Sequence, residues 1–351
     1  MRAFPCSLQA AGASRLLAAI AVTAAALLTL PNAASAQDVD AAVHKANLYI
    51  ETVKLTEQAA DSWDRYASWV NMKTGPTGKE RYISYGLYEV YNGSLKAARD
   101  AARLQPEASP LDAAMQRYID AYEALAPVLN QATAYYDRRG YQTDGVAEGK
   151  ALHGRMVPLA NAFLTEREAM LPQLRAFIRD VEVQELAATE AREGRSRAWH
   201  VANVMHAVNI IVDLFPHERP KPIDADTLDQ MMMSIGPDTP GAALDAIIAG
   251  VVPPTGVVID MQRFEPALKG YAEAVEAFDR FAAENAEGLA SFRRVPRQLL
   301  NALQALQQPL QRHQGRDFDG SGPLVGQVVQ AYAEMLSTAS QLTSSRLRYL
   351  P

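Results

Sequence analysis

Aromatic side chains are concentrated in one part of this 351-residue chain. Eleven of the 14 tyrosines lie between Tyr49 and Tyr141, together with two of the three tryptophans. Ring faces bury apolar surface while hydroxyls form hydrogen bonds, so the cluster could line a groove for a glycan, a peptide or an amphipathic ligand. The alternative is core packing, with hydroxyls bonded at the edge of a bundle. The candidate binding residues are Trp63, Tyr66, Trp69, Tyr82, Tyr85, Tyr88, Tyr135, Tyr136 and Tyr141.

Three ionisable residues at the end of this region could bind an anion or move a proton. Lys150 and His153 are one helical turn apart and follow a loop that contains Asp144. The more ordinary interpretation is a helix cap at Asp144 followed by a solvated helix face. We include all three among the candidate ligand-binding residues and assign no catalytic residue.

The remaining metal-binding residue types have unfavourable spacing. His200 and His206 are six residues apart, about 240° around a helix, whereas a zinc pair needs a spacing of three or four. None of the six histidines occurs in H-x-x-E or H-E-x-x-H. Residues 317–320 (DFDG) resemble the start of a calcium loop, but the other ligands are missing, which favours a turn. Nucleophile-elbow, Walker and dinucleotide motifs are also missing, so we expect no metal and no cofactor.

The first 36 residues have the layout of a secretory signal peptide. Arg2 and Arg15 give a positive start, residues 16–30 are apolar, and Ala34–Ala36 forms an A-x-A site. We expect cleavage before Gln37 and a periplasmic mature chain. The apolar run is short for a membrane helix, so no stable span should remain after cleavage.

The cysteine content and the net charge narrow the class of protein further. The only cysteine, Cys6, precedes the apolar run, so the mature chain has no disulfide and a lipoprotein is not expected. Loss of the two leader arginines changes the formal net charge from −6 to −8. An acidic chain without long basic runs is poorly suited to binding nucleic acid or an anionic membrane surface.

Helix signals dominate the mature chain, and strand signals are almost absent. Residues 39–73 and 79–104 are predicted as two helices that fold back on each other. The turn between them is GPTG at 75–78. Its first glycine and its proline can end a helix, and its threonine can form a capping box with Glu80 for the next.

Further helices are predicted at 111–139, 146–215, 264–286, 289–311 and 323–348. The pattern over 146–215 is too long for one ordinary helix, so Pro158 and Pro172 should kink or divide it, and Gly194 is another weak point. The predicted fold class is therefore all-α, with long kinked helices in antiparallel bundles.

A Pro-rich connector separates two helical parts. The predicted organisation is a signal peptide (1–36), an N-terminal bundle (37–215), the connector (216–262) and C-terminal helices packed on the bundle (263–351). Inside the connector we expect short helices at 226–234 and 240–249, and a weak strand at 257–260.

Several short sequences resemble the YiiG-like bacterial envelope proteins, a family with a domain of unknown function. They occur in one order along roughly residues 50–200, and the rest matches more loosely. The pieces are RYASW (65–69), GPTGKER (75–81), YGLY (85–88), YIDA (118–121), YY (135–136), Tyr141, Asp144, GKALH (149–153) and REG (192–194). The resemblance implies an exported, mostly helical protein and no assigned reaction. Members of the family often look like lipoproteins, whereas this chain lacks a cysteine at the cleavage site.

These observations favour a non-catalytic binding or envelope-support role. The ligand or partner would be a small molecule, a glycan, a peptide or another envelope protein. One alternative is an enzyme whose site is assembled from distant residues in the Tyr-rich region, which predicts convergent Asp, Lys or His side chains. Another is a scaffold partner of an envelope protein, which predicts an exposed apolar patch.

Overall fold

The computed structural model describes residues 36–215, 258–285, 289–316 and 321–342. Residues 1–35 of the predicted signal peptide, most of the connector with its two predicted helices, and the DFDG sequence lie outside these residues. The described chain is all-α, as predicted. Its α-helices are α1 (Ala36–Ala67), α2 (Lys96–Ala101), α3 (Ser109–Asp137), α4 (Ala147–Glu193), α5 (Arg197–Val212), α8 (Met261–Glu284), α9 (Ala290–Arg312) and α10 (Ser321–Leu342), with 3-10 turns η1 (Ile83–Tyr85) and η2 (Gly140–Gln142).

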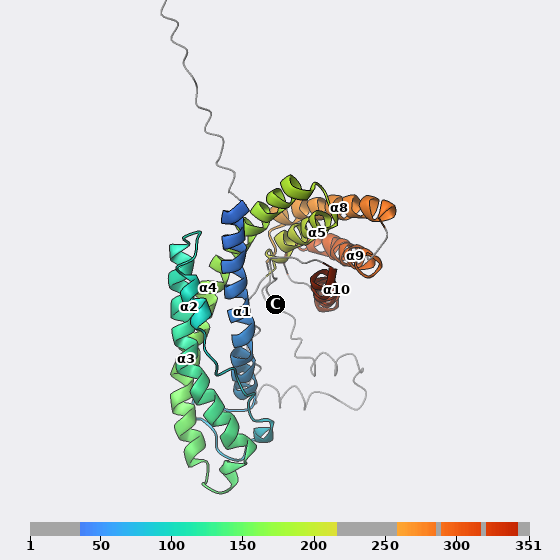
Figure 1. Ribbon diagram of the computed structural model, residues 1–351. Helices are drawn as coiled ribbons and strands as arrows, with labels where there is room; N and C mark the ends of the chain where they lie inside the picture. The colour runs from blue at the N-terminus through green and yellow to red at the C-terminus, as the bar shows by residue number, and fades with distance from the viewer. Residues whose placement is uncertain (1–35, 216–257, 286–288, 317–320, 343–351) are drawn as a thin grey trace, which may run out of the picture. The chain divides into compact units, whose positions relative to one another are not determined.

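The first hydrophobic core is formed by α1, α2, α3 and α4. Figure 1 shows α3 beside α4, and α1 packs on both. The inner face of α3 carries apolar side chains at helical spacing, and all of them are buried. They are Met115, Tyr118, Ile119, Tyr122, Leu125 and Leu129.

The long pattern over 146–215 forms two helices, α4 and α5. Pro158 and Pro172 lie inside α4, and neither ends it. The break comes at Gly194, whose φ of 68° is a backbone conformation that favours glycine. Ser196 then begins α5, because its side chain accepts a hydrogen bond from the Trp199 N–H.

A second hydrophobic core is formed by α5, α8, α9 and α10. Its centre contains Tyr271, Phe278 and Phe292, all fully buried. The strand predicted at 257–260 is wrong. Val258 makes only an isolated antiparallel bridge with Arg316, supported by a 2.8 Å hydrogen bond from the Ile259 N–H to the Gly315 carbonyl.

The predicted helix over 79–104 is also wrong. This region contains a turn, η1, an extended segment and only the six-residue α2. The predicted bond between Glu80 and Thr77 does form, but it closes a loop, since the Glu80 carboxylate accepts from the backbone N–H groups of Thr77 and Gly78 without a helix following. The first helix, α1, also ends six residues earlier than predicted, at Ala67.

The extended segment together with Tyr85, the last residue of η1, is called the strap (residues 85–91). No strand neighbours it among the described residues, so side chains of α1, of α3 and of Trp69, just after α1, satisfy its backbone. Ser62 accepts from the Tyr88 N–H at 3.1 Å and donates to the Tyr88 carbonyl at 3.0 Å. The Asn130 amide bonds both backbone groups of Val90, at 2.8 and 3.0 Å. Further bonds come from Arg65 to Tyr85, Trp69 to Gly86, Thr133 to Tyr88 and Tyr122 to Tyr91.

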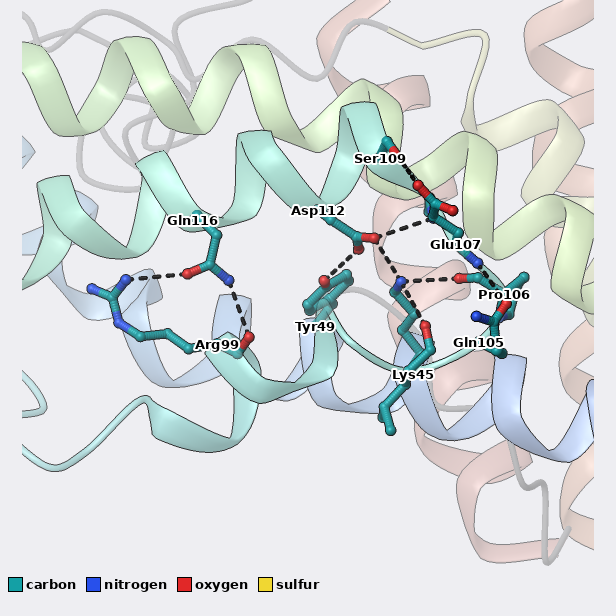
Figure 2. A network of polar contacts seen from close by, with 11 residues as sticks. Lys45, Tyr49, Arg99, Gln105, Pro106, Glu107, Ser109, Asp112 and Gln116 are labelled. Carbon is teal, nitrogen blue, oxygen red and sulfur yellow. Dashed lines mark hydrogen bonds and ion pairs between the residues drawn. The ribbon is translucent and has the colours of Figure 1, made fainter.

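A buried ion pair fixes the other end of the connection between α1 and α3 (Figure 2). The Lys45 ammonium lies 2.8 Å from an Asp112 carboxylate oxygen, and its remaining donors reach the carbonyls of Leu104 at 3.2 Å and Pro106 at 3.0 Å. The Tyr49 hydroxyl donates to the other Asp112 oxygen at 2.6 Å. Lys45 is fully buried, and all three of its N–H donors are used.

Replacing Lys45 with methionine should lower the free energy of unfolding by about 3 kcal/mol, because Asp112 would remain buried without its cation. Adding Asp112→Asn should recover part of this loss, since the second buried charge is then removed. Urea unfolding of the two variants measures both effects.

Lys96→Met serves as the matched control, because the Lys96–Asp100 pair is on the surface and should contribute little. A Lys45→Met variant as stable as the control would show that the buried pair does not hold the 104–106 turn.

Candidate functional site

Tyr66 lies at the centre of a buried aromatic cluster built by α1, α3 and α4. Its ring centroid is 5.0 Å from that of Trp69, 5.7 Å from Trp63, 6.2 Å from Tyr136 and 5.9 Å from His153. All five side chains are buried. Edge-to-face contacts join Trp69 to both tyrosines, an arrangement that stabilises aromatic cores. These predicted binding residues therefore form part of the hydrophobic core.

The GPTG turn packs on the first turns of α4. Gly75 and Gly78 have φ values of 73° and 81°, which favour glycine. A Cβ at Gly75 would lie 3.0 Å from the His153 ring, and one at Gly78 would lie 2.5 Å from the Val146 side chain. Both glycines are therefore required by close contact with α4 as well as by backbone conformation.

His153 joins the turn to the aromatic cluster. Its Nδ1 lies 2.9 Å from the Tyr66 hydroxyl. Burial lowers the pKa of His153 below the ordinary histidine value, and a hydrogen bond to the Met72 carbonyl opposes this only in part. The ring is thus neutral near pH 7 and serves as a hydrogen-bonded core residue. The nearby Tyr136 hydroxyl is buried and has no hydrogen-bond partner in the described chain.

Asp144 is the predicted helix cap. One of its carboxylate oxygens accepts from the Val146 N–H at 2.8 Å and the other from the Glu148 N–H at 3.0 Å. These backbone hydrogen bonds, led by that from Glu148, lower the pKa of Asp144. The Tyr135 hydroxyl also donates to Asp144 at 3.0 Å, and burial and this bond raise the pKa of Tyr135 to about 12.

The three ionisable candidates do not form one cluster. Lys150 is exposed, His153 is buried beside Tyr66, and Asp144 caps α4. Within the described residues no hydrogen bond or ion pair joins Lys150 to either of the others. Tyr141 is half-buried, and its ring centroid lies 6.3 Å from that of Tyr136.

The remaining candidate binding residues, Tyr82, Tyr85 and Tyr88, differ from the buried ones because two of them are exposed. Tyr85 and Tyr88 retain 52% and 39% of their accessible surface, while Tyr82 is half-buried and stacks on Tyr85 at 5.1 Å. Arg65 fixes both exposed rings. Its Nε donates to the Tyr85 carbonyl at 2.7 Å, its Nη1 donates to the Tyr88 hydroxyl at 2.6 Å, and its guanidinium lies 4.4 Å from the Tyr88 ring centroid. We call Tyr82, Tyr85, Tyr88, Arg65 and Arg81 the tyrosine face.

The Lys45–Asp112–Tyr49 cluster is a convergent charged group that sequence spacing did not reveal. Asp112 lies more than 60 positions from Lys45 and Tyr49, so no local motif marks the cluster. Burial raises the pKa of Tyr49 well above its usual range, and the hydrogen bond to Asp112 adds to the effect. Lys45 and Tyr49 are fully buried and Asp112 nearly so, which leaves no reacting atom accessible to a ligand.

The other titratable residues form no metal site in the described part of the chain. No group of three or more His, Cys, Asp or Glu side chains there could hold an ion. His206 instead lies 2.9 Å from Glu182, whereas the His200 ring stacks on Phe281. Among the same residues, no helix is both long and apolar enough to cross a membrane.

Comparison with known proteins places this all-α chain in a family without a known activity. The family described as "Protein of unknown function (DUF3829)" matches residues 40–232, more than half of the chain, so the chain belongs to it. The "Uncharacterized protein YiiG" of Escherichia coli (strain K12) is 31% identical over 181 residues. The match covers 50% of this chain and 51% of that protein, so it spans about half of the relative. No solved structure matches the chain.

The buried state of His153 has a consequence for stability at low pH. In the unfolded chain this histidine takes up a proton near pH 6.5, whereas the folded ring does so only at lower pH. The contribution of His153 should therefore be constant above pH 6.5. It should fall by up to about 1.4 kcal/mol per pH unit as the pH drops from there toward the folded pKa.

Urea unfolding at pH 7.5, 6.5, 5.5 and 4.5 tests this, with His153→Asn as the comparison. Asparagine can bond the Tyr66 hydroxyl but does not titrate, so the variant should lose less stability on acidification than the wild type. Parallel pH profiles for the two proteins would contradict the assignment.

Proposed function

We propose that the mature chain is an exported binding protein of the bacterial envelope, with no catalytic role, and that the tyrosine face is its contact surface. The observation that carries this proposal is the pair of exposed rings, Tyr85 and Tyr88, fixed by Arg65 on the strap. Exposed aromatic rings held in one orientation lose little conformational entropy when a ligand binds.

Contacts elsewhere in the molecule support binding rather than catalysis. The inner aromatic residues are buried against one another, and His153 is neutral and hydrogen-bonded among them. The Lys45–Asp112–Tyr49 cluster is enclosed between α1 and α3. These groups stabilise the fold, and the groups left for contact at the strap are the exposed tyrosine rings and the Arg65 guanidinium, residue types that dominate binding energy at interfaces.

Purified mature chain should sediment with a total envelope preparation of membranes and cell wall. The Tyr85→Ala/Tyr88→Ala variant should bind at least about tenfold more weakly, because truncating aromatic contact residues typically costs more than 1.4 kcal/mol. Val183→Ala/Val329→Ala is the matched control, since it truncates two exposed apolar side chains on α4 and α10 that keep at least as much of their surface exposed as the two tyrosines. The binding role would be refuted if the wild type did not sediment with the envelope preparation, or if both variants bound it equally well.

Export has a separate test. The proposal rests on the positively charged start, the apolar run and the A-x-A site of residues 1–36. Expressed with this leader in a bacterium, the chain should appear in the periplasmic fraction with an intact mass that starts at Gln37. Leu17→Arg/Ile20→Arg should block export and leave the full-length mass in the cytoplasm. Retention of the wild-type leader in the purified protein would contradict cleavage.

A further inference from the structure

We propose that the tyrosine face binds a glycan whose sugar rings carry carboxylates. This inference rests on the proposed binding function and names the class of its ligand. It starts from the alternation of rings and cations on the face. The Arg81 guanidinium lies 5.5 Å from the Tyr82 ring centroid, Tyr82 stacks on Tyr85, and Arg65 lies 5.7 Å from Tyr85 and 4.4 Å from Tyr88.

The exposed rings suit the apolar side of a sugar. One face of a pyranose presents C–H groups that carry partial positive charge, and these fit the negative face of an aromatic ring. Tyr85 and Tyr88 offer such faces because each keeps a large share of its surface exposed. Both rings are also fixed, since Arg65 bonds the Tyr85 carbonyl and the Tyr88 hydroxyl, and the backbone of Tyr88 is bonded to Ser62 and Thr133.

Arg65 supplies the site for a carboxylate. Its Nε and Nη1 each use one N–H within the protein, which leaves the Nη2 donors for a ligand. Among the described residues no carboxylate pairs with Arg65, so its charge is uncompensated at a partly exposed position. A planar guanidinium binds carboxylates through two parallel hydrogen bonds, so a sugar acid placed on Tyr88 could engage ring and cation together.

Neighbouring charges favour the same ligand. Lys73 and Lys79 are exposed beside the GPTG turn, and neither has an ion-pair partner among the described residues. Glu80, the acidic residue between Lys79 and Arg81, is held by the Thr77 and Gly78 N–H groups, which lower its pKa against the effect of burial. On the strap itself, the negative charge of Glu89 repels an anion. We therefore expect the face to recognise carboxylates that are spaced apart rather than densely packed negative charge.

The size of the face distinguishes a glycan from a protein partner. A stable protein interface buries about 800 Å² on each side and has a wide apolar centre. The other large exposed apolar side chains in the described residues are Val183, Ile210, Val258 and Val329, which lie on other elements. Two fixed rings with one available guanidinium group match one or two sugar units.

Calorimetric titration of the full mature chain with three probes tests the proposal. Tetragalacturonate has sugar rings and carboxylates, maltotetraose has rings alone, and tetraglutamate has carboxylates alone. Tetragalacturonate should bind at least about tenfold more tightly than either of the others. Tyr85→Ala should weaken it about tenfold, and Arg65→Gln should reduce its affinity to that of maltotetraose. Val183→Ala/Val329→Ala should bind like the wild type.

Three results would overturn the inference. They are equal affinity for tetraglutamate and tetragalacturonate, equal affinity for maltotetraose and tetragalacturonate, and no tetragalacturonate binding at about 1 mM. If one of these occurs while Tyr85→Ala/Tyr88→Ala still abolishes sedimentation with the envelope, the binding function stands and only the glycan class is wrong. If the wild type does not sediment with the envelope, the binding function itself fails.

Discussion

The connection between α1 and α3 depends on one constraint, which is that backbone N–H and C=O groups removed from water need hydrogen-bond partners. Beyond Tyr85, the last residue of η1, the strap forms no helix and pairs with no strand in the described part of the chain, so side chains from both flanking helices supply these partners. Ser62 and Arg65 act from α1, and Asn130 and Thr133 act from α3. This bonding holds Tyr85 and Tyr88 at the surface.

A side chain also bonds the backbone carbonyls of the turn at residues 104–106. The carbonyls of Leu104 and Pro106 are bonded by the buried Lys45 ammonium, whose charge is balanced by Asp112. Both ends of the α1–α3 connection are therefore held by long-range polar side chains. A connection fixed in this way can present exposed aromatic rings in a single orientation, which links the folding constraint to the proposed binding surface.

Sequence periodicity predicted the helices whose stabilising contacts are local or are made by apolar residues that recur on one helix face. The α3 and α8 helices were found from apolar residues at helical spacing, and these residues are buried. The helix over 79–104 was predicted from tyrosines at every third position, but the partners of the strap lie 17 to 45 positions away. The sequence also did not predict that Tyr66 approaches His153, which lies 87 positions along the chain. Nor did it predict that the inner rings are buried whereas Tyr85 and Tyr88 are exposed.

The GPTG turn shows why the family resemblance carries fold information rather than chemistry. Capping accounted for Gly75 alone, yet the structure adds a reason for both glycines, because Gly75 lies against His153 of the GKALH sequence and Gly78 lies against Val146. Two pieces of the resemblance are thus one contact between a turn and the first part of α4. That contact orders the aromatic core, and the ordered core supports the strap. Binding is therefore best sought at the exposed rings on the strap, since the residues beneath them are occupied in holding the fold.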